Sequence, residues 1–212
     1  MRIRGIALLL LLSCWSLQGQ HVSVGVKIGS TPLGVFEGTP GELTDASKRY
    51  TFGPSVEVSL PKGFAIEVDA LYRRIGFDSD HHSNPVRVFV RERANAWEIP
   101  VVAKYRVWRA RAVHPFVLAG YAPRVVSGSG YSRVVSSPFP IGPAVETHST
   151  DYPVTHGFVT GGGVEVRARR VRFAPEVRYT HWSRRIYDVG FGGTHDFARQ
   201  NQVQLLLGIS WP

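Results

Sequence analysis

Apolar and polar residues alternate one by one along most of the chain after residue 20. Between residues 158 and 166 the even positions are Phe, Thr, Gly, Val and Val, and the odd positions from 159 to 167 are Val, Gly, Gly, Glu and Arg. A period of two is typical of β-strands, because successive side chains point to opposite faces of a sheet. The pattern restarts after Arg169 and Arg170, which predicts two strands joined by a tight turn.

Alternation of this kind marks eight segments, so the chain is predicted to be all-β. In the fifth segment both faces are apolar, and its register stays open. The segments are His21–Ser30, Tyr50–Leu60, Gly63–Phe77, Asn95–Trp108, His114–Val126, two segments within Gly157–Trp182, and Arg199–Trp211.

The connections between these segments alternate in length. Three are tight turns, at Pro61–Gly63, Arg109–Val113 and Arg169–Arg170. If neighbouring strands are antiparallel, the short turns and both termini lie at one end, and the long connections lie at the other. Short turns at one end and long loops at the other, on an even number of strands, are typical of outer-membrane barrels. The predicted long loops are Thr31–Arg49, Asp78–Ala94, Ser127–Thr155 and Ser183–Ala198.

The polar faces favour a membrane barrel over a soluble one. Inside a narrow barrel charges must pair, because an isolated buried charge is very costly. The twelve charged residues opposite the apolar faces are balanced, six acidic and six basic, as an internal ion-pair network requires. A soluble lipocalin-like barrel with an apolar lumen is the alternative. The twelve are Lys27, Glu57, Glu67, Asp69, Arg73, Glu98, Lys104, Arg106, Glu165, Arg167, Glu176 and Arg178.

Within this network, four carboxylates are expected to point inward and to pair with nearby cations. They are Glu67, Glu98, Glu165 and Glu176, with Lys104, Arg106, Arg167 or Arg178 as partners. The apolar faces should carry aromatic girdles near both strand ends. The candidates are Tyr72 and Trp97 toward the loops, and Tyr105, Phe173 and Trp211 toward the turns.

Residues 1–20 have the pattern of a cleaved signal peptide, which leaves residues 21–212 as the barrel domain. Arg2 and Arg4 precede an apolar run at Ile6–Leu12, and Gly19 stands at a plausible cleavage point. Cys14 is the only cysteine; a lipoprotein site at this residue is the alternative, and the mature chain is otherwise free of thiols. The formal charge of +9 is spread over scattered arginines, which fits anionic lipid head groups better than nucleic acid.

The chain resembles the small eight-stranded outer-membrane β-barrel superfamily, the OmpA-like and OmpX-like barrels. The stretch "GPSVEVSLPKGFAIEVDALYRR" looks like a strand–turn–strand hairpin of that group, and "WEIPVVAKYRV", "GFVTGGGVEVR" and "PEVRYTHW" look like its strands. The resemblance implies an eight-stranded antiparallel up-and-down transmembrane β-barrel with a charge-filled lumen, in the bacterial outer membrane. Expected partners are outer-membrane lipid or lipopolysaccharide and the assembly machinery, and we expect a monomer. Barrels of this group usually end in an aromatic residue, whereas here Pro212 follows Trp211.

Two clusters have residue types that carry chemistry. His181 and Ser183 share one face near the loop end of the seventh strand, a spacing that suits a base and a nucleophile. They are similar to the His-x-Ser element of the outer-membrane lipid A deacylases, although Arg184 replaces that family's Asn. The third member would be Asp188 or Asp196. The plainer interpretation is an interface histidine and a loop serine.

The second cluster is Asp78, Asp80, His81 and His82, a set that suits a transition metal, although adjacent loop histidines are more often merely solvated. No cofactor is expected.

Taken together, the sequence favours a scaffold over an enzyme or a porin. Eight strands leave a lumen just wide enough for side chains, which argues against an open pore. Function should then reside in the long loops, as a structural or surface-interaction role. A lipid-modifying enzyme is the second hypothesis, and a soluble ligand carrier is the third.

Overall fold

A computed structural model describes residues 21–37, 43–83, 86–107, 113–136, 145–185, 188–191 and 194–211. The predicted signal peptide and Pro212 lie outside the described residues, as does most of the predicted turn at Arg109–Val113. Within the described part of the chain, no helix is long and apolar enough to cross a membrane.

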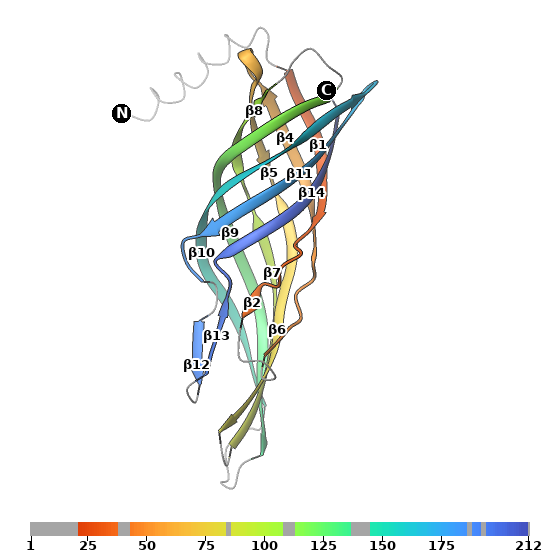
Figure 1. The fold of residues 1–212 in the computed structure, drawn as a ribbon. Coiled ribbons are helices and arrows are strands. Elements are labelled where there is room, and N and C mark those ends of the chain that lie inside the picture. Colours follow the sequence, from red (N-terminus) through yellow and green to blue (C-terminus); the bar gives the residue numbers. More distant parts are fainter. Residues whose placement is uncertain are drawn as a thin grey trace, which may run out of the picture.

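The strands form a closed, eight-stranded antiparallel β-barrel, which confirms the predicted fold class (Figure 1). Each strand pairs with its neighbours along the chain, and the last pairs with the first, from Val24 opposite Trp211 to Ser30 opposite Leu205. Two of the eight barrel strands are each divided into two segments, and we call each of the eight a stave. The staves are β1 (His21–Ser30), β4 (Tyr50–Ser59), β5 (Phe64–Asp69) continued by β6 (Leu71–Ser83), β7 (Val86–Glu98) continued by β8 (Val101–Arg106), β9 (Val113–Ser136), β10 (Val145–Ala168), β11 (Val171–Trp182) and β14 (Asn201–Trp211).

Two staves are interrupted at the same level of the barrel. The first breaks at Ala70 and the second at Ile99 and Pro100, where proline cannot donate to a ladder. Neighbouring backbone groups still find partners across the break, since Asp69 N donates to Pro100 O (3.1 Å) and Ala70 N donates to Pro54 O (3.0 Å). The barrel wall therefore stays continuous through both interruptions.

The two ends of the barrel differ as the loop lengths predicted. At one end, here called the turn end, lie the 3-10 turn η2 (Pro61–Gly63) and the two-residue turn Arg169–Arg170. Strand β1 begins there and β14 ends there (Figure 1). The opposite end, the loop end, carries the long connections.

Two of the four predicted long loops instead continue the barrel strands as β-sheet. Strands β6, β7, β9 and β10 run well past the level where β11 and β14 end, and form a narrow sheet that we call the blade (Figure 1). In its described residues it comprises 78–83, 86–94, 127–136 and 145–152. For these described residues, the prediction of loops at Asp78–Ala94 and Ser127–Thr155 was therefore wrong. Outside the barrel no face needs to be uniformly apolar, so the strands lose the pattern that identifies them.

Shorter strands complete the loop end. Strand β3 (Leu43–Asp45) pairs with β6, from Leu43 opposite Ser79 to Asp45 opposite Phe77. A separate small sheet contains β2 (Phe36–Glu37), β13 (Thr194–Ala198) and β12 (Asp188–Phe191). It connects the first and last long loops.

The polarity of the barrel is inverted relative to a soluble protein. Apolar side chains face outward on every stave, as on β1, where Val22, Val24, Val26 and Ile28 are exposed. Charged side chains face inward and are buried. Strand β9 is apolar on both faces: Val117, Tyr121 and Val125 point out, whereas Phe116, Leu118 and Ala122 point in. The open register of the fifth predicted segment is thereby settled.

Apolar side chains also close the lumen at the loop end. Val35 and Phe36 from the first connection, together with Ala198, pack against the inward-facing side of β6, β7 and β9. We call this group the loop-end cap. Its buried members are Val35, Phe36, Ile75, Phe77, Ala94, Ala96, Val126 and Ala198.

Candidate functional site

The lumen near the turn end is filled by a lattice of ion pairs centred on Glu67. Its carboxylate lies 2.5 Å from Lys27 Nζ, 2.5 Å from Lys104 Nζ and 2.6 Å from Arg178 Nη2. The three cations come from β1, β8 and β11, so this one side chain links opposite walls of the barrel. Glu67 itself is 3% exposed.

Further carboxylates extend the lattice to both sides. Arg178 also reaches Asp69 (2.7 Å) and Glu176 (2.9 Å), and Lys27 reaches Glu176 (2.8 Å). Toward the turn end, Arg106 contacts both Glu57 (2.5 Å) and Glu165 (2.9 Å). Each buried cation in this layer has a carboxylate partner.

Sequence reasoning missed Arg172 in this layer. Its Nη1 lies 3.2 Å from Glu57 and 3.6 Å from Glu165, and its side chain is buried. The signal was present, because Arg172 shares the inward parity of Glu176 and Arg178 on the same strand. Arg167, by contrast, lies at the rim. Its side chain is 55% exposed and contacts Glu165 at 3.3 Å.

A second polar layer lies above this lattice, toward the loop end. Glu98 accepts hydrogen bonds from Arg73 (3.0 Å), Gln202 (3.2 and 3.1 Å) and Gln204 (3.0 Å). Beside it, the Arg124 guanidinium stacks on the Trp182 ring at 3.8 Å. Of the charged residues expected inside, Glu98 and Arg73 are placed here.

Arg124, Gln202 and Gln204 were also missed by sequence reasoning. The inward parity of Gln202 and Gln204 was readable on the last strand, but only charged residues were considered as lumen candidates. Arg124 belongs to the fifth segment, whose two apolar faces hid its direction. In the structure it faces inward with Ala122 and Val126.

At the turn end the lumen opens into a basic cavity of about 590 Å³. No carboxylate stands among the described residues that line it, whereas six lysine and arginine side chains do. Its rim includes Lys62 and Arg169, whose φ angles are 62° and 55°. Non-glycine residues are uncommon in this left-handed region. The cavity therefore presents positive charge to any small anion at this end. The six are Lys62, Arg106, Arg167, Arg169, Arg170 and Arg172.

Aromatic side chains ring the outer wall at both ends. At the loop end Tyr72 lies between Phe52 and Trp97, with ring centroids 5.5 Å and 5.2 Å away. At the turn end the ring centroids of Phe64 and Tyr105 lie 4.9 Å apart. Phe173, just after the turn Arg169–Arg170, and Trp211, at the end of β14, are also exposed. Such girdles are expected where an apolar wall meets two lipid–water interfaces.

His181 and Ser183 both face outward at the loop end, where the imidazole is held by an amide. His181 Nδ1 lies 2.8 Å from Asn201 Oδ1, which also accepts a hydrogen bond from the Tyr179 hydroxyl (2.8 Å). The Ser183 backbone N–H donates to His156 O (2.8 Å). Strands β12 and β13 contain Asp188 and Asp196, whose side chains lie outside the described part. The described side chains therefore supply a base and a hydroxyl without a carboxylate to orient the base.

The acids of the second cluster pair with arginines across the blade. Asp78 lies 3.0 Å from both Arg91 and Arg93, and Asp80 pairs with Arg87. Partial burial raises the pKa of Asp78, but hydrogen bonds from the two arginines outweigh it and hold the pKa below its ordinary value. The described residues contain no group of three or more metal-ligating side chains. The side chains of His81 and His82 lie outside the described part.

Comparison with solved structures shows that the fold is that of the small outer-membrane β-barrels. Neisserial surface protein A matches with a TM-score of 0.51 at 12% identity, over 91% of this chain and 98% of its own. Outer membrane protein OprG from Pseudomonas aeruginosa matches with a TM-score of 0.55 at 10% identity, over 91% and 94%. No protein-family profile and no curated protein sequence matches the chain.

Proposed function

We propose that this protein is a non-conducting barrel of a bacterial outer membrane that holds a β-sheet blade outward for contact with the cell's surroundings. The observation that carries the proposal is the inverted polarity: an apolar outer wall around a lumen of paired charges. A soluble protein would expose this wall to water over its whole circumference, at a large hydrophobic cost. A lipid bilayer removes that cost.

The strand lengths support a membrane location. Where the barrel wall is not extended, β1 and β4 have 10 residues, β14 has 11 and β11 has 12. A tilted strand needs about 9–11 residues to cross a bilayer. Exposed basic residues just beyond the loop-end girdle, namely Lys48, Arg49 and Arg74, are suited to the phosphates of lipopolysaccharide.

The contents of the lumen support a closed barrel. Ion pairs bridge opposite walls, and the loop-end cap covers them. The cavity within the lattice is about 20 Å³, enough for little more than one water. We therefore expect planar bilayers containing the purified protein to show no stable conductance steps, in contrast to a general porin measured in parallel. Large, lasting steps would refute a closed lumen.

The blade is the part suited to binding, because it extends the barrel sheet beyond the girdle and displays charged side chains. Replacing Asp80–Phe89 with Asn-Gly shortens the β6–β7 hairpin at a register where its two strands are paired. We expect cells with this variant to lose adherence to immobilised matrix proteins, polysaccharides or other cells, while the barrel keeps its heat-modifiable gel migration.

The matched control is Ser183→Ala, which alters the loop end without touching the blade. Equal adherence of wild type, control and shortened variant at equal surface amounts would contradict a surface-interaction role. On the outer wall, we propose that His181 acts as an interface residue bonded to Asn201 rather than as a catalytic base.

A further inference from the structure

The charges of the lumen balance in one layer and not in the other. In the layer centred on Glu67, five buried carboxylates (Glu57, Glu67, Asp69, Glu165 and Glu176) face five buried cations (Lys27, Lys104, Arg106, Arg172 and Arg178). The upper layer contains one buried carboxylate, Glu98, and two buried arginines, Arg73 and Arg124. Among the described side chains, the upper layer thus carries one positive charge in excess.

Arg124 is the cation left without a carboxylate contact in the described part. Its Nε donates to Thr155 Oγ1 (3.1 Å) and its plane stacks on Trp182. Its Nη2 is buried without a hydrogen-bond partner, as is Nε of Arg73. Glu98 lies on the adjacent strand, but both its oxygens already accept bonds from Arg73, Gln202 and Gln204. A charge buried in this way is strongly unfavourable unless something compensates it.

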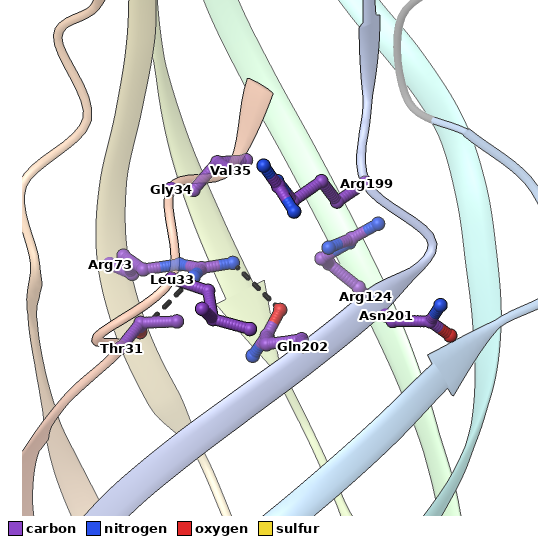
Figure 2. A pocket seen from close by; sticks show the side chains of 9 residues that line it. All are labelled: Thr31, Leu33, Gly34, Val35, Arg73, Arg124, Arg199, Asn201 and Gln202. Carbon is purple, nitrogen blue, oxygen red and sulfur yellow. Dashed lines mark hydrogen bonds between the residues drawn. The ribbon is translucent and has the colours of Figure 1, made fainter. Parts of the chain in front are cut away.

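The two arginines line one small cavity. Figure 2 shows the guanidinium groups of Arg73 and Arg124 around a common space, with Arg199 above them and Gln202 beside them. The cavity volume is about 10 Å³, which is room for a particle the size of one water. None of the described residues that line it is acidic. Positive donors therefore surround a space of single-ion size.

We propose that this cavity binds one small inorganic anion of the chloride type. A halide accepts hydrogen bonds from several N–H groups at once and neutralises the excess charge of the upper layer. A water molecule would satisfy donors but would leave the charge. A sulfate or an organic anion is too large for the space. This site differs from the blade and from the barrel closure on which the proposed function rests.

Occupancy of the site should stabilise the loop end. Thr31, Leu33, Gly34 and Val35 form one side of the cavity, and Val35 also belongs to the loop-end cap. Thr31 receives a hydrogen bond from Arg73 at 3.2 Å. An ion held between Arg73 and Arg124 would thus fix the first connection over the lumen. A ligand that binds only the folded state raises stability in proportion to the logarithm of its concentration.

The test is the urea unfolding midpoint of the purified protein in neutral detergent. Sodium chloride replaces sodium gluconate at constant ionic strength, so that the anion changes from one too large for the cavity to a small halide. We expect the wild-type midpoint to rise with chloride. Arg124→Gln should remove this rise and keep one midpoint in both salts, because the excess charge is gone. Arg133→Gln, an exposed arginine on the same strand, is the matched control and should keep the full rise.

A second measurement needs no variant, in case Arg124→Gln fails to fold. Crystals of the wild-type protein grown in bromide should show an anomalous scattering peak between Arg73 and Arg124. A midpoint that ignores the anion, an equal chloride effect in Arg124→Gln, or a cavity without anomalous signal would each overturn the proposal. All three outcomes leave barrel closure and the blade untouched, so failure here is distinguishable from failure of the proposed function.

Discussion

At the scale of single residues, the lumen is held by carboxylates that each serve several cations. Glu67 contacts Lys27, Lys104 and Arg178, which come from three different strands. Removing one partner of a buried ion pair leaves the others uncompensated in a poorly solvated space, which is worse than never burying them. The barrel interior is therefore sensitive to the loss of this one charge.

Glu67→Gln should accordingly destabilise the barrel by about 3–5 kcal/mol. The unfolding midpoint in urea, followed by tryptophan fluorescence, measures the change. Arg167→Gln removes a charge from the same network at its exposed rim and should cost less than about 1 kcal/mol. If both variants lose a similar free energy of unfolding, the contacts of Glu67 stabilise the barrel no more than a contact at the exposed rim.

At the scale of elements, the sequence predicts the barrel strands well and the blade poorly. The alternation on β1, β4, β11 and β14 exists because one face meets apolar surroundings and the other meets paired charges, and that constraint is local and readable. Residues 78–83 and 86–94 pair with each other as β6 and β7, and their other ladder partners, β3 and β9, are distant in sequence. Such pairing leaves little trace in the pattern of a single segment.

The sequence likewise predicts some of the candidate residues well and others poorly. Inward parity identifies Glu57, Glu67 and Glu176, because their neighbours on each strand alternate cleanly. It misses Arg124, because β9 carries apolar residues on both faces. It also does not reveal that Asp78 and Asp80 pair with arginines of the facing strand, since that contact depends on the register of the β6–β7 hairpin.

The blade should loosen in acid through Asp78. Burial opposes ionisation, but the bonds from Arg93 and Arg91 hold the pKa below 3.8, so the carboxylate stabilises the folded state above that pH. This stabilisation is lost as the pH falls through the lowered value. Pepsin should therefore cut the β6–β7 hairpin faster relative to the barrel as the pH drops below 3.8.

In Asp78→Asn the hairpin lacks this titration, and its susceptibility to pepsin relative to the barrel should stay constant over the same pH range. Asp45→Asn, also at the loop end but bonded to backbone N–H groups of Val35 and Ser47, is the control and should keep the wild-type pH profile of the β6–β7 hairpin. A wild-type profile in Asp78→Asn would assign the acid sensitivity to another group.

At the scale of the whole molecule, polarity, girdles and lumen are parts of one arrangement. In the proposed membrane location, lipid would cover the apolar outer wall, the inward charges would pair with each other, and the two aromatic rings would lie where lipid gives way to water. The blade lies beyond one ring and the basic cavity beyond the other. The proposed location requires that the outward-facing apolar residues contact the bilayer.

The most direct measurement is the environment of a spin label at Val101 in liposomes. Val101 is 43% exposed on the stave formed by β7 and β8, midway between the girdle residues Trp97 and Tyr105, and the native mature chain is expected to contain no cysteine. A label on Val101→Cys should be relaxed strongly by oxygen, which concentrates in lipid, and weakly by a water-soluble nickel chelate. A label on Arg133→Cys in the blade should show the reverse. If the Val101→Cys label is as accessible to nickel as the blade label, the outer wall faces water and the proposed membrane location is wrong.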